Sequence, residues 1–199
     1  MPGTRSRSAA ITRALTDAGA SPRISMPRTA VMSSIASTRC SPSIERRTDR
    51  FLDVARSNGL PPFLAHDPGV DSGLMIAQYT AAGLVSELKR LAVPASVDSI
   101  PSSAMQEDHV SMGWHAARKL RRSIDALTRV LGIELLTAAR AQDLRAPLEP
   151  SPITRSVKDL LRGRGIPGPG PDTYLSPDLE AAADAVRDGA VAAQLGARP

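Results

Sequence analysis

The residues from Ser102 to Gly113 combine the side chains of this chain that are best suited to chemistry. Gln106, Glu107 and Asp108 follow closely on a pair of serines. Ser103 and Gln106 have the spacing of a capping box, in which two side chains bind the free backbone N–H groups at a helix start. The dipole of that helix would favour the ionised form of Glu107. Taken alone, an acidic first turn after a capping serine is a common signal of a helix start, so a structural role is the commoner explanation.

Other side chains with chemical potential lack the partners they would need. His109 and His115 are six residues apart, so on a helix they point in different directions, and with His66 they find no cysteine or paired carboxylate to complete a zinc site. The hydroxyls from Ser99 to Ser103 have no readable His and Asp partners of a serine hydrolase. The loop from Gly165 to Pro171 lacks the Lys-Ser/Thr pair of a phosphate-binding loop. We therefore expect no metal.

Composition limits the class of protein. A length of 199 residues allows one domain with a substantial core, and 42% apolar but only 3% aromatic residues mean that Leu, Val, Ile and Ala build it. This composition favours helices. No apolar segment approaches the ~18 residues that span a bilayer, so we expect no membrane association. The single Cys40 excludes an internal disulfide, and the cytoplasm is the default location.

The positive charge is confined to the N-terminal tail. Residues 1–44 hold six Arg and one Asp, whereas the rest holds 19 basic and 19 acidic residues, so the net charge of +5 gives no nucleic-acid-binding surface on the folded part. The Ser- and Arg-rich tail, residues 1–43, has the composition of a disordered extension or of a transit peptide. Residues 44–199 are expected to form the folded, helical part.

Hydrophobic spacing predicts an all-α chain. Helices are expected over residues 44–56, 72–92, 154–162 and from Ser176 to Gly189, with an extended segment at Leu60–Phe63. Gly83 suggests close helix packing within the second of these helices. The longest helix is expected from Ala104 to about Ala141. Its apolar stripe consists of Leu120, Ile124, Leu127, Leu131, Leu135 and Ala138.

A helix of that length would reach roughly 55 Å, which one chain of this size does not easily cover. Packing against helices of other subunits is therefore the favoured explanation, and a kinked helix within one chain is the alternative.

The stretch from Pro94 to Gly113 resembles the C-terminal signature of histidine ammonia-lyases, a family of aromatic amino acid lyases. Five further motifs resemble the same family in the same order, and the likeness covers roughly Ile44 to Val191. These motifs are Glu45–Arg50, Gly59–Leu64, Gly73–Thr80, Ile133–Leu136 and Tyr174–Asp178. The tail does not resemble the family, which favours a frame disruption or a misplaced start as its origin over targeting.

The resemblance implies a long-helix bundle in which four subunits associate, with each active site drawing residues from several subunits. It implies elimination of ammonia from L-histidine to give trans-urocanate, by an internal methylidene-imidazolone that forms from an Ala-Ser-Gly triplet. Gln106 and Glu107 match the active-site Gln-Glu pair of the family, and Glu107 would accept an N–H of the imidazole ring. Met105 stands where related sequences often have Asn.

The catalytic electrophile is missing from this sequence. No Ala-Ser-Gly triplet occurs in the chain, and neither does the N-terminal half that supplies the tyrosine base of the family. We therefore expect a C-terminal part of a histidine ammonia-lyase that is inactive alone and needs no external cofactor. A related lyase or aminomutase acting on phenylalanine or tyrosine is one alternative. Glu107 weighs against it, because lyases of the family that act on phenylalanine resemble Gln-Asp at this place. A non-catalytic helical oligomerisation module is the other.

Overall fold

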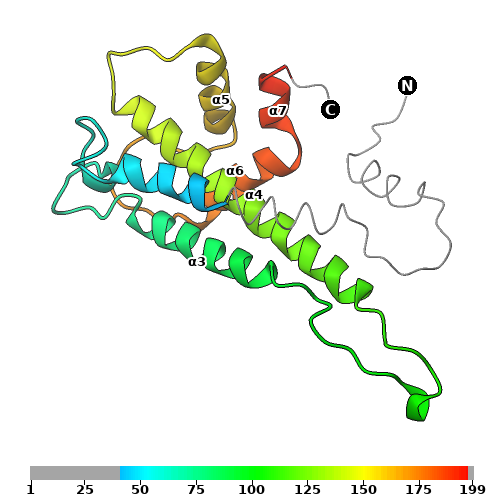
Figure 1. Cartoon of the computed structure of the whole chain (residues 1–199). Coiled ribbons are helices and arrows are strands. Elements are labelled where there is room, and N and C mark those ends of the chain that lie inside the picture. The colour runs from blue at the N-terminus through cyan, green and yellow to red at the C-terminus, as the bar shows by residue number, and fades with distance from the viewer. Residues whose placement is uncertain (1–40, 197–199) are drawn as a thin grey trace, which may run out of the picture.

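The computed structural model describes residues 41–196, and its elements are helices joined by loops (Figure 1). The principal helices are α3 (Met75–Leu91), α4 (Gly113–Asp143), α5 (Pro152–Gly163), α6 (Ser176–Arg187) and the short α7 (Ala190–Gln194). Residues 41–52 are also helical. Within the described residues the only β pairings are two isolated bridges, so the all-α prediction is confirmed.

Most predicted elements occur close to their expected bounds. The helices expected over 72–92 and 154–162 correspond to α3 and α5, and α6 ends before Gly189, which has φ 78. Ser151 caps α5, since its Oγ accepts the N–H of Thr154, and Pro152 occupies the first turn. The expected extended segment is partly wrong, because Pro62–Leu64 forms a 3-10 turn with Phe63 at φ 54.

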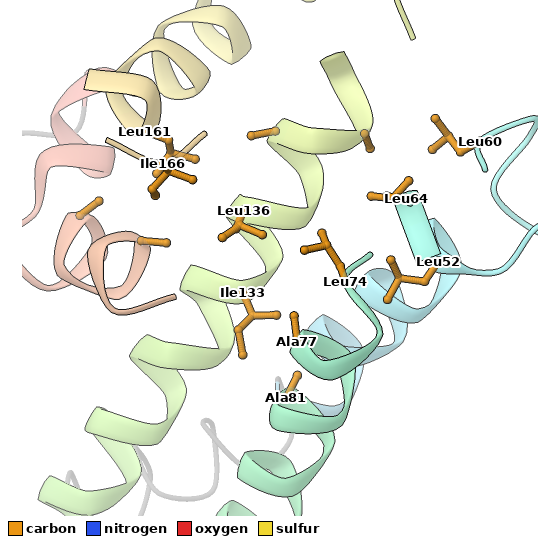
Figure 2. Packing of buried hydrophobic residues seen from close by; sticks show 14 residues of the cluster. Leu52, Leu60, Leu64, Leu74, Ala77, Ala81, Ile133, Leu136, Leu161 and Ile166 are labelled. Atoms are coloured by element: carbon orange, nitrogen blue, oxygen red, sulfur yellow. The ribbon is translucent and has the colours of Figure 1, made fainter. Parts of the chain in front are cut away.

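Helix α4 runs through the described part of the chain, and α3 and α6 pack against it (Figure 1). Its 31 residues correspond to about 46 Å. Helices α3 and α6 both pack along α4, and Leu74 and Ala77 face Ile133 and Leu136 in its C-terminal half (Figure 2). The helix over residues 41–52 lies against the same core through Leu52. We call these four helices the helical body.

Helices α4 and α6 approach each other closely at Gly132 of α4. A Cβ built on Gly132 would lie 2.7 Å from the backbone N of Ala183 in α6 and 3.0 Å from the carbonyl carbon of Ala182. Only glycine lets the two backbones meet at this distance. The expectation that Gly83 marks a close approach is wrong for this chain, since a Cβ there would meet nothing within 4 Å.

The apolar stripe of α4 that was expected to pack against other subunits is a face that flanks the buried one. The buried positions of α4 include Ser123, Ala126, Val130, Ile133 and Leu136, whereas Ile124 of the stripe is 47% exposed. Leu127, Leu131 and Leu135 are partly buried at the edges of the core. Helix α4 thus carries a second apolar face that the described part of this chain covers only in part.

Candidate functional site

The segment that joins α3 to α4 contains both predicted site residues. Residues 92–112, here called the α3–α4 loop, extend beyond the helical body as a long hairpin (Figure 1). Pro101 and His109 form an antiparallel bridge, and Val110 N–H donates to the carbonyl of Ile100 over 3.2 Å. The side chain of Ser99 donates to the carbonyl of Val110 over 2.7 Å. These bonds pair the two arms of the hairpin and fix where its tip lies.

The prediction that a helix begins at Ala104 is wrong, because α4 begins at Gly113. The capping box does not form either: the short turn at Ser103–Met105 has no side-chain cap bond, and the carbonyl of Ser103 accepts the backbone N–H of Gln106. Since no helix starts here, the helix-dipole argument for Glu107 does not hold.

The tip of the hairpin is a left-handed turn. Ser103, Ala104 and Met105 have φ values of 53, 53 and 69. None of the three is a glycine, and L residues in this region are strained. Such strain commonly persists where a structure holds a functional group in a set position.

Glu107 and Gln106 both lie at this tip and are exposed in the isolated chain. The Glu107 carboxylate accepts a hydrogen bond from Ser102 Oγ at 2.8 Å. The structure therefore brings the two predicted residues together, but on a projection and not against a pocket wall of this chain. The prediction that Glu107 lies at the amino end of a helix is therefore wrong. A binding pocket around Glu107 would need walls from other protein surfaces.

The chain also has a hollow that sequence reasoning missed. It encloses about 430 Å³ between α3, α4 and the start of α6. Its apolar lining includes Ile76 of α3 and Ile133 of α4, with Leu175 and Leu179 near the start of α6. Three motifs that were recognised by resemblance, Gly73–Thr80, Ile133–Leu136 and Tyr174–Asp178, contribute to its lining, but none was given a role.

The charged groups that line the hollow are already paired. Arg129 Nε donates to Glu180 Oε1 over 2.9 Å. The carboxylate of Asp172 accepts the backbone N–H groups of Ser72 (2.7 Å) and Gly73 (2.9 Å). These hydrogen bonds, that from Ser72 foremost, hold the pKa of Asp172 below its ordinary value. With its charges engaged, the hollow presents mainly apolar surface, which suits packing against protein better than catalysis.

Arg140 of α4 holds the loop before α6, which consists of residues 164–175. Its guanidinium donates to the carbonyl of Gly170 over 3.0 Å, and its Nε is buried without a hydrogen-bond partner. Burial lowers the pKa of Arg140, while the charges of Asp172 and Asp71 act in the opposite direction. Arg140 thus anchors the loop before α6.

The loop tip and the hollow are separate places. Gly113 and Ile133 are twenty residues apart on α4, which is about 30 Å along the helix axis.

No group of three or more His, Cys, Asp or Glu side chains within residues 41–196 could hold a metal ion. The described part of the chain also has no helix long and apolar enough to cross a membrane.

The sequence of this chain is similar to the sequences of known lyases. The family model described as aromatic amino acid lyase matches residues 29–163. The histidine ammonia-lyase of Streptomyces avermitilis is 68% identical over 147 residues, which are 74% of this chain and 29% of that protein. The histidine ammonia-lyase of Streptomyces coelicolor is 67% identical over 145 residues. The chain thus spans under a third of the length of these relatives.

Solved structures show the same helical arrangement. The crystal structure of histidine ammonia-lyase from Trypanosoma cruzi has a TM-score of 0.78 at 38% identity, covering 85% of this chain and 33% of that one. The tyrosine aminomutase from Streptomyces globisporus has a TM-score of 0.76 at 36% identity, with 82% and 31% covered. The backbone likeness therefore does not separate the two activities. The match to the family model begins at residue 29, before Ile44. The predicted N-terminal tail falls mostly on residues 1–40, which lie outside the described residues.

Proposed function

Because this chain belongs to the aromatic amino acid lyase family, we propose that it is the C-terminal part of a histidine ammonia-lyase. The intact enzyme would eliminate ammonia from L-histidine to give trans-urocanate, the first step in degrading the amino acid. The observation that carries this proposal is the 68% identity to the Streptomyces avermitilis histidine ammonia-lyase, together with Gln106 and Glu107 at the tip of an exposed loop. We also propose a cytoplasmic location, which is the default for a chain with a single cysteine.

The role proposed for Glu107 follows from the chemistry of an imidazole substrate. An ionised carboxylate accepts a ring N–H, which orients the ring, and it stabilises positive charge on that ring. The amide of Gln106 has both donor and acceptor atoms for further substrate contacts. Both side chains lie on a projecting tip, so they can reach a site whose other walls come from another part of the protein.

This chain does not provide the electrophile of the reaction. The methylidene-imidazolone of the family activates the substrate amine as a leaving group, and it forms from an Ala-Ser-Gly triplet that these 199 residues lack. Since the chain spans 29% of its Streptomyces avermitilis relative, the remaining part of an intact lyase would supply this group. We therefore propose that the isolated chain is inactive and binds no external cofactor.

The flanking apolar face of α4 supports assembly with other helices. Ile124 is 47% exposed, and Leu127 and Leu131 are covered only in part. Trp114, at the start of the same helix, is 72% exposed. Apolar side chains in a row along a long helix favour burial against a partner helix. A homo-oligomer, with four subunits as the family resemblance implies, would cover this face.

A related aminomutase is the second candidate, because the likeness to the tyrosine aminomutase from Streptomyces globisporus is nearly as high as that to a histidine ammonia-lyase. Glu107 weighs against it. The Gln-Glu pair of this chain matches histidine ammonia-lyases, whereas lyases that act on phenylalanine resemble Gln-Asp at this place.

A hybrid enzyme distinguishes these proposals. In it, the 147 matched residues of the Streptomyces avermitilis lyase are replaced by those of this chain. We expect the hybrid to convert L-histidine to urocanate, detected by ultraviolet absorbance, and to leave L-tyrosine and L-phenylalanine unchanged. The unmodified relative is the positive control. A folded hybrid without histidine turnover, or one that prefers tyrosine, would contradict the proposal, as would appreciable turnover by this chain alone.

A further inference from the structure

Ser102 contacts Glu107 through both its side chain and its backbone. Ser102 Oγ donates to Glu107 Oε2 over 2.8 Å, and the carbonyl oxygen of Ser102 accepts the backbone N–H of Glu107 over 3.3 Å. Together, the two bonds join the first and the last residue of the turn over residues 102–107. We infer that Ser102 is a positioning residue that sets the direction of the Glu107 carboxylate, an inference that rests on the proposed role of Glu107.

The paired arms of the loop hold Ser102 in place. It follows Pro101, which bridges to His109, and its backbone is extended at φ −108 and ψ −179. Ser102 is partly buried, whereas the residues that follow it in the turn are exposed. The hydroxyl donor therefore belongs to the paired part of the loop, and the carboxylate that it binds belongs to the tip.

The left-handed turn between the two residues explains why such a link is needed. Ser103, Ala104 and Met105 all have positive φ, a conformation that costs free energy for L residues. A strained backbone persists only where surrounding interactions fix it. The double contact between Ser102 and Glu107 closes that turn, so it stabilises the backbone and the carboxylate together.

The geometry leaves one carboxylate oxygen for the substrate. A carboxylate accepts hydrogen bonds at both oxygens, and Ser102 occupies only Oε2. Oε1 is then available to the ring N–H of an imidazole, with the carboxylate already oriented before the substrate arrives. Ser102 itself would not touch the substrate, so its effect on turnover would pass entirely through Glu107.

Kinetics of the hybrid enzyme test this inference. We expect Ser102→Ala to lower kcat/KM for L-histidine about tenfold, which is the effect of losing one hydrogen bond to a charged group. Ser102→Thr keeps the hydroxyl in an extended backbone and should restore most of the activity. Ser103→Ala is the matched control, because the Glu107 carboxylate accepts its hydrogen bond from Ser102 and not from the neighbouring Ser103, and its kcat/KM should stay near that of the unsubstituted hybrid.

A double-mutant cycle separates positioning from loop stability. If Ser102 acts through the carboxylate, Ser102→Ala should have no further effect in the Glu107→Gln background. Equal losses in both backgrounds would overturn the inference and leave a merely structural serine. A Ser102→Ala hybrid as active as the unsubstituted one would also overturn it. If Glu107→Gln has no effect by itself, the proposed function of Glu107 fails instead.

The full chain allows the same test without catalysis. Three-bond NMR couplings of Glu107 should report one dominant χ1 rotamer, which becomes averaged in Ser102→Ala and is restored in Ser102→Thr. Averaging in the unsubstituted chain, or no change in Ser102→Ala, would overturn the positioning role. This outcome is independent of whether the hybrid turns over histidine, so failure of this inference and failure of the proposed function remain distinguishable.

Discussion

The helical body and the α3–α4 loop are held together by different interactions. Leu74, Ala77 and Ile133 are at most 1% exposed in the body, and their positions are set by apolar contact between helices (Figure 2). From Ser103 to Ser111 every residue of the loop is exposed, and backbone pairing with a few side-chain bonds fixes its shape. The body therefore carries the stability of this chain, while the loop carries the side chains proposed for function.

The largest effect is expected from a cavity in the body. Leu74 is fully buried, so Leu74→Ala should lower the free energy of unfolding by about 3 kcal/mol, measured by chemical denaturation. Val97 in the loop is 72% exposed, and Val97→Ala should change it by less than about 0.5 kcal/mol. Equal losses at the two positions would show that the loop is part of the core and would remove the contrast.

A smaller loss is expected where α4 meets α6. Gly132→Ala should cost about 2 kcal/mol, because its Cβ would lie 2.7 Å from the backbone N of Ala183. Gly83→Ala in α3 is the matched control and should stabilise the protein by about 0.5 kcal/mol, since nothing lies within 4 Å and alanine favours helices. Denaturation midpoints of the two variants should move in opposite directions. A neutral Gly132→Ala would mean that the helices do not meet there.

Acid should weaken the link between residues 71–73 and the loop before α6. The pKa of Asp172 is lowered by the N–H groups of Ser72 and Gly73, so its contribution to stability is present above the unfolded-state pKa, about 3.8, and is lost as the pH falls through the folded-state value. Burial raises the pKa of Asp178, which acts in the opposite sense. Denaturation midpoints from pH 7 downward should fall less in Asp172→Asn than in the unsubstituted chain. Parallel curves would show that Asp172 makes no such contribution.

The smallest effect is expected at the tip of the loop. Met105 has φ 69, a conformation that asparagine tolerates better than methionine, so Met105→Asn should relieve about 0.5 kcal/mol of local strain. Slower amide hydrogen exchange at Gln106 and Glu107 would report this relief. Met105→Ala is the control and should show no slowing, and equal slowing in both variants would contradict the explanation from backbone strain.

The same contrast explains what the sequence could predict. Helices α3, α5 and α6 were predictable because apolar spacing, prolines and glycines mark them locally. The buried face of α4 was not, because the helix has two adjacent apolar stripes and only the position of α6 at Gly132 decides which one this chain covers. Periodicity identifies faces, but not which partner covers each face.

The candidate site was predictable in residue type and not in geometry. Gln106 and Glu107 were found by resemblance, and their roles stay predictions. Their local structure was misjudged, because Ser103 and Gln106 match a capping box by spacing alone while the hairpin depends on pairing between Ile100 and Val110. The hollow near Leu175 was missed because it forms between elements distant in sequence.

The most direct measurement is the kcat/KM of the hybrid enzyme for L-histidine with Glu107→Gln. We predict a loss of about a hundredfold, because a neutral amide replaces the charged acceptor of the ring N–H. Asp108→Asn, one residue away and equally exposed, is the matched control and should stay within about twofold of the unsubstituted hybrid. A Glu107→Gln hybrid that turns over L-histidine as fast as this control would contradict the account.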